Sequence, residues 1–270
     1  MIRGREGATA VAPVVFVHGT GHAAWCWEYF ARAFAHAGYA TYAVSLRGHG
    51  GSGGPERLRG ASIADYVADV RSIAERLDAP PILIGHSLGG FVVMRYLQKH
   101  PASAAVLLAP APTCGMLIAN WQIGVRHPVA LLRCLAKRDF TQFYHSPKIT
   151  HELLFRSTTP RAEVERWHPR MGGESFRAGA AMLWPLGGRR SFDCPVLVVG
   201  GTKDKVVPLR STRRTADALG ATMLTIENAA HELMLDRGWE EVAAKVAGWL
   251  NANGVGPASV PLRESDGAQE

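Results

Sequence analysis

The sequence predicts an α/β fold: a doubly wound, mainly parallel sheet of about six strands flanked by helices. Three observations lead to this prediction. Strand-like and helical patterns alternate along the chain, which is typical of parallel strands joined by helical crossovers. Several strand-like runs are continuously apolar, as expected for strands that are covered on both faces. The alternation is interrupted once, by about 80 residues between the fourth and fifth strand-like runs.

The strand-like runs are short stretches rich in apolar and β-branched residues, at 14–17, 40–46, 82–84, 104–108, 196–199 and 222–226. Helical patterns lie between or after them, at 27–36, 63–77, 91–100, 210–219 and 239–250. The last helix has the clearest amphipathic period, with apolar residues at Trp239, Val242, Ala243, Val246, Trp249 and Leu250. We expect these helices to cover the two faces of the sheet.

The long interruption, residues 111–190, is predicted to be a mostly helical cap inserted into the sheet order, since a structureless loop of that length would be rare. Residues 1–110 and 191–250 then form the two parts of the core. Residues 251–270 are rich in Gly, Pro and Ser, and we expect a flexible tail there. The cap holds 12 Lys or Arg against 5 Asp or Glu, whereas the rest of the chain holds 18 of each. The whole net charge of +7 therefore lies on the cap.

Composition narrows the class of protein. The 270 residues, 47% hydrophobic and 20% charged, suit one sizeable globular domain. The four cysteines are widely spaced, which favours thiols in a reducing compartment over a disulfide framework. With no secretory signal and no apolar run long enough to span a membrane, the cytoplasm is the expected location. The sequence contains no metal-ligand cluster and no nucleic-acid-binding motif, so neither partner is expected.

A Gly-x-Ser-x-Gly motif is the most informative local signal. It consists of residues 85–89, between the strand-like run 82–84 and a helical pattern that begins with glycine. In this context a strand ends, the chain turns sharply, and the serine is held exposed where the helix begins. The flanking glycines are needed because a Cβ atom would collide in so tight a bend. We therefore predict that Ser87 is a nucleophile.

Two later strand-like runs are followed by residues that would activate Ser87. Asp204 follows the run 196–199, and His231 follows the run 222–226. In a parallel sheet the carboxyl ends of the strands meet at one edge, so these side chains are expected to converge. A serine hydroxyl needs an imidazole to take its proton, and a carboxylate fixes the tautomer of that imidazole. Ser87, His231 and Asp204 are the predicted catalytic residues.

Other acidic residues are weaker candidates for the carboxylate. Asp193 precedes its strand, Asp139 lies in the cap, and Asp236 follows His231 too closely to approach it from a separate loop. Glu227 is the most serious competitor, because it stands directly at the end of a strand, but we expect it to face solvent.

An acyl-transfer site also needs donors for a developing oxyanion. The backbone N–H of Leu88 lies at the start of the helix after Ser87, where free amides and the helix dipole favour negative charge. We expect the second donor to be the N–H of Thr20, in the loop after the first strand, with Gly19 allowing the close approach. His18 in the same loop is expected to be a structural hydrogen-bonding residue.

As a set, these segments resemble the α/β-hydrolase superfamily with a serine nucleophile. The first block is similar to the branch that holds methylesterases and hydroxynitrile lyases, although those lyases carry threonine at the position of Gly19. The resemblance implies an α/β-hydrolase fold, with Ser87, Asp204 and His231 as the triad and Thr20 and Leu88 as oxyanion donors. The segments are His18-Gly19-Thr20-Gly21-His22-Ala23-Ala24-Trp25, Leu46-Arg47-Gly48-His49-Gly50, Gly85-His86-Ser87-Leu88-Gly89-Gly90, Gly200-Gly201-Thr202-Lys203-Asp204 and Ala230-His231.

The predicted function is that of a cofactor-independent carboxylic ester hydrolase, which acts on a small or medium, partly hydrophobic acyl substrate. Two alternatives stay open: a thioesterase or biosynthetic hydrolase, lyase or cyclase that uses the same site, and a receptor-like member that binds a ligand. The cap aromatics are interpreted first as the cap's own core. The sharper hypothesis is an acyl pocket under a basic rim, which would attract an anionic substrate, an acyl carrier protein or an anionic membrane surface. Leaving group, acyl length and oligomeric state are open.

Overall fold

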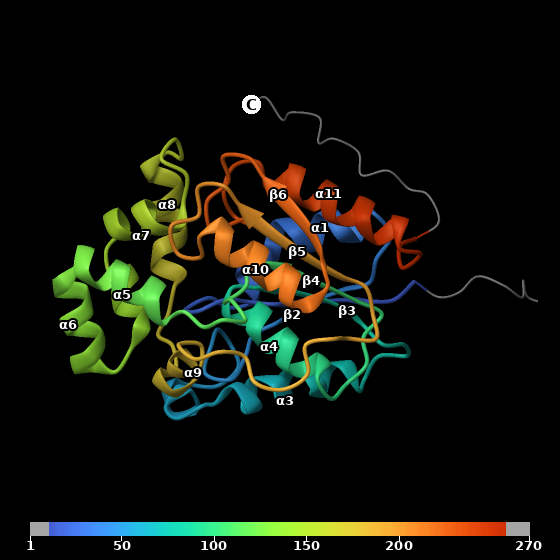
Figure 1. Cartoon of the computed structure of the whole chain (residues 1–270), viewed down its shortest axis with the longest axis horizontal. Coiled ribbons are helices and arrows are strands. Elements are labelled where there is room, and N and C mark those ends of the chain that lie inside the picture. Colours follow the sequence, from blue (N-terminus) through green and yellow to red (C-terminus); the bar gives the residue numbers. More distant parts are fainter. Residues whose placement is uncertain (1–10, 258–270) are drawn as a thin grey trace, which may run out of the picture.

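The structure is a computed structural model that describes residues 11–257. Among these residues, six strands form one sheet in the order β2-β1-β3-β4-β5-β6, and every neighbouring pair is parallel. The predicted fold class is confirmed (Figure 1). The strands are β1 (Val14–Val17), β2 (Thr41–Val44), β3 (Ile82–His86), β4 (Ala104–Leu108), β5 (Val196–Gly201) and β6 (Thr222–Ile226).

The strands match the sequence patterns closely, with instructive differences at their ends. Strands β1, β4 and β6 have the predicted bounds. Strand β2 is shorter than the run 40–46, although Leu46 beyond its end is fully buried. Strands β3 and β5 continue two residues further than predicted, to His86 and Gly201. A strand that continues to His86 ends directly at Ser87.

Helices cover both faces of the sheet, as the continuously apolar strands predicted. Helices α1 and α11 pack against each other on one face, and α3 and α4 pack together on the other, where α10 also lies against β5 (Figure 1). The aromatic ring of Phe16 on β1 stacks on Trp27 and meets Phe34 edge-on, which fixes α1 to the sheet. The core helices are α1 (Glu28–His36), α2 (Pro55–Leu58), α3 (Ile63–Ala74), α4 (Leu88–Leu97), α10 (Leu209–Leu219) and α11 (Trp239–Ala252), and the 3₁₀ helix η1 is Ala24–Trp27.

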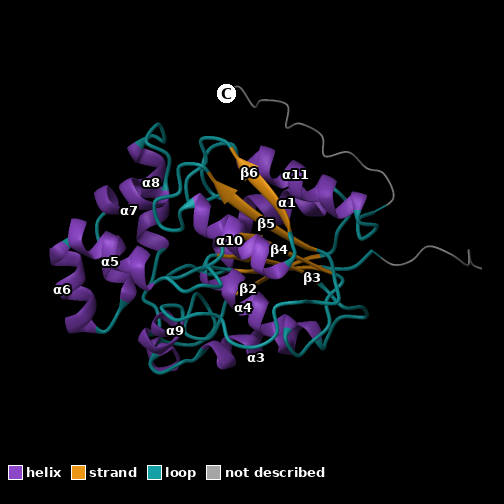
Figure 2. Ribbon diagram, in the orientation of Figure 1, coloured by secondary structure: helices purple, strands orange, loops and turns teal. Residues whose placement is uncertain are grey.

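The segment between β4 and β5 is mostly helical. Its helices gather at one end of the molecule, beyond the carboxyl ends of the strands (Figures 1 and 2). They are α5 (Leu117–Arg126), α6 (Pro128–Lys137), η2 (Phe140–Tyr144), α7 (Pro147–Leu154), α8 (Arg161–Trp167), η3 (His168–Arg170) and α9 (Phe176–Ala181). We call residues 111–190 the cap; its status as a separate unit stays a prediction.

The end of the chain departs from the predicted tail. Helix α11 extends to Ala252, two residues into the segment 251–270, because its period of buried residues continues to the last turn. Residues 258–270 lie outside the described part of the chain. No helix within residues 11–257 is long and apolar enough to cross a membrane.

Candidate active site

Ser87 occupies the turn between β3 and α4. Its backbone has φ 51° and ψ −113°, a conformation that few side chains adopt and that stores about 1–3 kcal/mol of strain. The neighbouring strand holds it there. The Ser87 N–H donates to the Leu108 carbonyl at 3.0 Å, and the Ser87 carbonyl accepts from the Ala111 N–H at 3.0 Å. Hydrogen bonds to strand β4 and to the first residue of the cap thus hold the turn in this conformation.

Glycines are required on both sides of Ser87. A Cβ atom on Gly85 would lie 2.5 Å from the Gly89 carbonyl oxygen. A Cβ atom on Gly89 would collide with the carbonyl oxygens of Val17, at the end of β1, and of His18, directly after it. Because both obstacles are backbone atoms, neither can move aside cheaply. The predicted reason for the two glycines of the motif is confirmed.

Asp204 and His231 lie side by side at the carboxyl ends of β5 and β6. Nδ1 of His231 is 2.8 Å from Oδ2 of Asp204, and both side chains are buried. The other carboxylate oxygen of Asp204 accepts from the backbone N–H groups of Val206 and Val207, each at 2.8 Å. Since a carboxylate only accepts, Nδ1 of His231 carries the proton, and Nε2 is free to take one.

The environment of His231 favours its protonated form. Burial lowers the pKa of His231, but the charge of Asp204, the hydrogen bond to it and the charge of Glu232 raise the pKa, and the net result is above the ordinary value. The backbone of His231 lies against the serine turn, because Nε2 of His86 donates to the His231 carbonyl at 3.1 Å. The structure therefore joins Asp204 directly to His231 and brings His231 next to the residue that precedes Ser87.

The hydroxyl of Ser87 forms no hydrogen bond within the described part of the chain, and neither does Nε2 of His231. The sequence predicted an exposed serine, but Ser87 is only 7% exposed, because the loops around the turn pack against it.

The loop after β1 lies directly beside Ser87. A Cβ atom on Gly19 would lie 2.8 Å from Nδ1 of His86 and 3.2 Å from Cβ of Ser87. The N–H of Thr20 makes no hydrogen bond with residues 11–257, and Leu88 is the first residue of α4, where helix N–H groups have no partner within the helix. The N–H groups of Thr20 and Leu88, the two predicted oxyanion donors, are therefore both without an acceptor among the described residues.

His18 holds this loop in place. Its Nδ1 donates to the Gly19 carbonyl at 2.9 Å, and its Nε2 accepts from the Leu46 N–H at 3.0 Å. Burial is the main reason why the pKa of His18 is well below its ordinary value, so the ring is neutral. As predicted, His18 is a structural hydrogen-bonding residue.

The sequence profile of the Alpha/beta hydrolase family matches residues 14–245, which is most of the chain. The chain belongs to the alpha/beta hydrolase family. It is 27% identical over 258 residues to a monoacylglycerol lipase of Mycolicibacterium smegmatis, covering 88% of this chain and 87% of the relative. It is 28% identical over 247 residues to the non-heme chloroperoxidase CPO-A1 of Kitasatospora aureofaciens, covering 85% and 88%. A methylesterase structure from Arabidopsis superposes with a TM-score of 0.68 at 18% identity, covering 90% of this chain and 100% of that one, and shows the likeness of fold.

The competing acidic residues of this hydrolase lie elsewhere. Glu227 is exposed, in agreement with the prediction, and Asp193 is exposed and pairs with Arg189. Asp139 caps the 3₁₀ helix η2 in the cap through a hydrogen bond from the Thr141 N–H. None of the three contacts His231.

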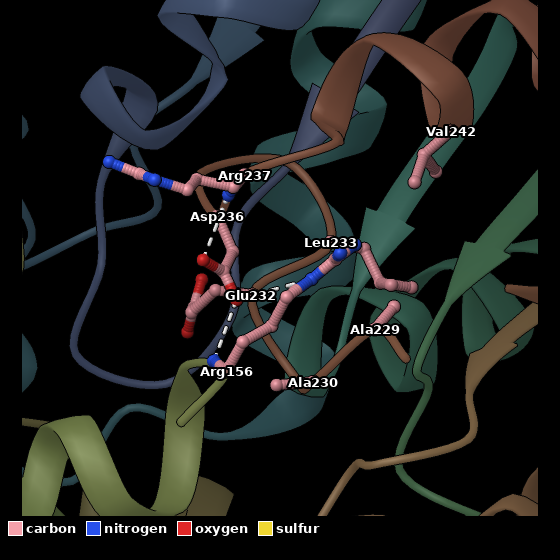
Figure 3. A pocket seen from close by; sticks show the side chains of 8 residues that line it. All are labelled: Arg156, Ala229, Ala230, Glu232, Leu233, Asp236, Arg237 and Val242. Carbon is pink, nitrogen blue, oxygen red and sulfur yellow. Dashed lines mark hydrogen bonds and ion pairs between the residues drawn. The ribbon is translucent and has the colours of Figure 1, made fainter. Parts of the chain in front are cut away.

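Asp236 is buried, and it binds the cap instead of His231. Its carboxylate accepts from the backbone N–H groups of Arg156 and Arg237, each at 2.8 Å, and from the hydroxyl of Thr159 at 2.5 Å. Figure 3 shows Asp236 between these two arginines, with Glu232 beside it. The residues line a small pocket that includes neither Ser87 nor Asp204; they are Arg156, Ala229, Ala230, Glu232, Leu233, Asp236, Arg237 and Val242.

Replacing Asp236 by alanine should destabilise the hydrolase. The change leaves three donors without their acceptor, and we expect the free energy of unfolding to fall by about 3 kcal/mol. Urea unfolding measures this difference. Asp193→Ala is the control, since that carboxylate is exposed and should leave the unfolding curve unchanged. An unchanged curve for Asp236→Ala would show that the cap is not fixed through this residue.

Two buried glutamates near the site, Glu174 and Glu232, were not predicted, because no sequence pattern indicates that a carboxylate is buried. Glu232, next to His231, has Oε1 at 3.4 Å from Nε2 of His22, and burial raises its pKa. Glu174 of the cap lies 3.4 Å from Nε2 of His49 and accepts from the hydroxyl of Tyr66. The pair of His22 and Glu232 links the loop after β1 to the loop that carries His231, and the pair of His49 and Glu174 links the loop after β2 to the cap.

The cap contacts the loops around the site at several points. The carbonyl of Leu154 accepts from the N–H of His231 at 3.1 Å, and the N–H of Gly172 donates to the carbonyl of Gly21 at 2.7 Å. The cap residue Trp167 stacks on Trp25, with ring centroids 5.7 Å apart. Of the cap aromatics, Phe143, Phe155 and Trp167 are buried, as expected for a cap core, while Trp121 and Trp184 are 63% exposed.

Proposed function

We propose that this member of the alpha/beta hydrolase family hydrolyses carboxylic esters through an acyl-enzyme on Ser87. The observation that carries the proposal is the hydrogen bond of 2.8 Å between Nδ1 of His231 and Asp204, which leaves Nε2 of the neutral ring as the proton acceptor. The backbone carbonyl of His231 lies against His86, the residue before Ser87. The strained turn that holds Ser87 between β3 and α4 supports the same role. The monoacylglycerol lipase among its relatives also supports ester hydrolysis.

The proposed reaction has two balanced halves. Nε2 of His231 takes the proton of the Ser87 hydroxyl while Oγ attacks the carbonyl carbon of the ester. The N–H groups of Thr20 and Leu88 stabilise the resulting oxyanion. The intermediate expels the alcohol, which receives the proton from His231. Water, deprotonated by His231, then attacks the acyl carbon. The acyl–Oγ bond breaks, Ser87 Oγ takes the proton from His231, and the carboxylic acid is released, so that an ester and water become an alcohol and an acid.

Asp204 contributes in each half by stabilising the imidazolium form of His231. It is a suitable partner because its remaining oxygen is already fixed by two backbone N–H groups, so the carboxylate does not reorient during the reaction. No step in this sequence requires a cofactor.

A series of p-nitrophenyl esters of increasing acyl length tests the proposal. We expect a burst of p-nitrophenol equal to the enzyme concentration, followed by slower turnover, because acylation precedes hydrolysis of the acyl-enzyme. Ser87→Ala should abolish both phases. Turnover of thioesters with poor cleavage of the matched oxygen esters would favour the thioesterase alternative. Ligand binding without turnover of either class would favour a receptor.

The pH dependence of kcat/KM should report His231. The ring must be neutral to take a proton, so activity is lost as the pH falls through its pKa. Because that pKa is raised, the midpoint of the acid limb should lie above the ordinary value of about 6.5. Replacing Asp204 by asparagine removes a cause of the raised pKa and should move the midpoint downward. A midpoint that does not respond to this change would mean that another group governs the limb.

A further inference from the structure

Helices α5 and α6 of the cap carry an exposed apolar surface. On α5, Leu117, Ile118, Trp121 and Val125 are 51–72% exposed, and on α6, Val129, Leu132 and Leu135 are 59–68% exposed. Elsewhere in residues 11–257, Tyr42 and Trp184 are the other large hydrophobic side chains with comparable exposure. Contiguous exposed apolar surface on a folded protein marks an interaction site.

The four residues of α5 lie on one side of that helix. Successive residues of an α-helix are rotated by about 100°, so positions 117, 118, 121 and 125 fall within an arc of about 100°. The buried residues Ile123 and Gly124 point elsewhere on the wheel. The exposed side chains therefore form a stripe that the rest of the cap does not cover.

The stripes of α5 and α6 combine into one face. A Cβ atom on Gly124 would lie 3.1 Å from Leu131, so the two helices pack closely at this point (Figure 1). On each helix the exposed stripe begins beside this contact, so the two stripes adjoin where the helices meet. We call the seven exposed residues of 117–135 the hairpin face.

Cations border the hairpin face. Arg126 lies beyond the stripe of α5, and Arg133 and Lys137 lie beyond the stripe of α6; all three are exposed. The sequence from 117 to 138 contains no Asp or Glu. A second copy of the chain would therefore bring two positively charged faces together. An apolar centre with a basic margin fits a surface of negatively charged lipid headgroups over acyl chains.

We propose that the hairpin face binds the surface of an anionic lipid bilayer. Leu117, Trp121 and Leu132 enter the boundary between headgroups and acyl chains, and Arg133 and Lys137 contact lipid phosphates. Helix α5 begins six residues after Ala111, whose N–H donates to the Ser87 carbonyl, so the chain runs directly from the candidate active site to the face. Binding requires no catalysis, so the proposal is independent of the ester hydrolase activity.

Flotation of the full chain with extruded vesicles tests the proposal. We expect binding to equimolar phosphatidylcholine and phosphatidylglycerol to be about tenfold or more tighter than binding to phosphatidylcholine alone, and to weaken with added salt. The double variant Trp121→Ser, Leu132→Ser should bind the anionic vesicles about tenfold or more weakly. Tyr42→Ser is the matched control, since it removes an exposed aromatic on strand β2, outside the cap, and it should bind like the unmodified chain.

A charge variant tests the basic margin separately. Arg133→Glu, Lys137→Glu should lose the preference for anionic vesicles, whereas the same reversal at the exposed Arg213 and Arg214 should keep it. Circular dichroism confirms that each variant is folded. Absence of binding to anionic vesicles, or equal losses in the control variants, would overturn the proposal. So would a dimer that the Trp121→Ser, Leu132→Ser variant dissociates while vesicles are not bound, because a second copy would then cover the face.

Discussion

Replacing Asp204 by asparagine should lower kcat for a p-nitrophenyl ester about 10⁴-fold. The side-chain NH2 group of asparagine can donate to Nδ1 of His231. The ring would then carry its proton on Nε2, the atom that must accept the serine proton. The substitution also removes the charge that stabilises the imidazolium. The side-chain oxygen of asparagine still accepts from the N–H groups of Val206 and Val207, so we expect the fold to be unchanged. Initial rates at saturating ester measure the loss.

Glu227→Gln is the matched control for this prediction. It makes the same change of carboxylate to amide at the end of the neighbouring strand, on an exposed side chain. Its kcat should stay within about twofold of the unmodified enzyme. If Glu227→Gln abolished turnover and Asp204→Asn did not, the assignment of the acid would be wrong.

Replacing Gly19 by alanine should lower kcat about 10²–10³-fold, the usual effect of losing one oxyanion donor. The new methyl group would meet His86 and Ser87 at 2.8 and 3.2 Å, so the loop must move and carry the Thr20 N–H away from the oxyanion. Binding of the ester should change much less, because the interaction forms in the transition state; we therefore expect KM to be nearly unaltered.

Gly51→Ala is the control for the substitution at Gly19. A Cβ atom on Gly51 meets nothing within 4 Å, so the same change of residue should leave kcat unaltered. An unaltered kcat for Gly19→Ala, with the protein folded, would show that the loop after β1 does not supply an oxyanion donor.

Much of the fold followed from the sequence, because the dominant signals are local. The runs at 14–17, 104–108 and 222–226 are apolar or β-branched throughout and end at polar or turn residues, and their bounds were predicted correctly. The start of α4 was placed at Phe91, three residues late. Glycines disfavour a helix interior, and only the close packing at Gly89 and Gly90 shows why the helix nevertheless begins at Leu88.

The positions of Ser87, Asp204 and His231 could be inferred because each follows a strand in a parallel sheet. The contacts of Glu232 and Glu174 could not. Both carboxylates are buried only because distant loops bring His22 and His49 beside them. A glutamate in isolation predicts solvent exposure.

The cap was the least predictable part. Its aromatic residues look alike in the sequence, yet Trp167 is buried against Trp25 while Trp121 is exposed on the hairpin face. The difference depends on which side of each helix meets the core. The sequence locates the positive charge of the cap but not the apolar surface that this charge borders.

The most direct test of the proposed function is covalent labelling with a fluorophosphonate, followed by peptide mass spectrometry. The reagent reacts with a serine whose hydroxyl is activated by a neighbouring base. We predict one adduct per chain, on the peptide that contains Ser87, and much slower labelling when His231 is replaced by alanine. Absence of an adduct on Ser87 in the folded protein, or labelling that does not depend on His231, would contradict the account.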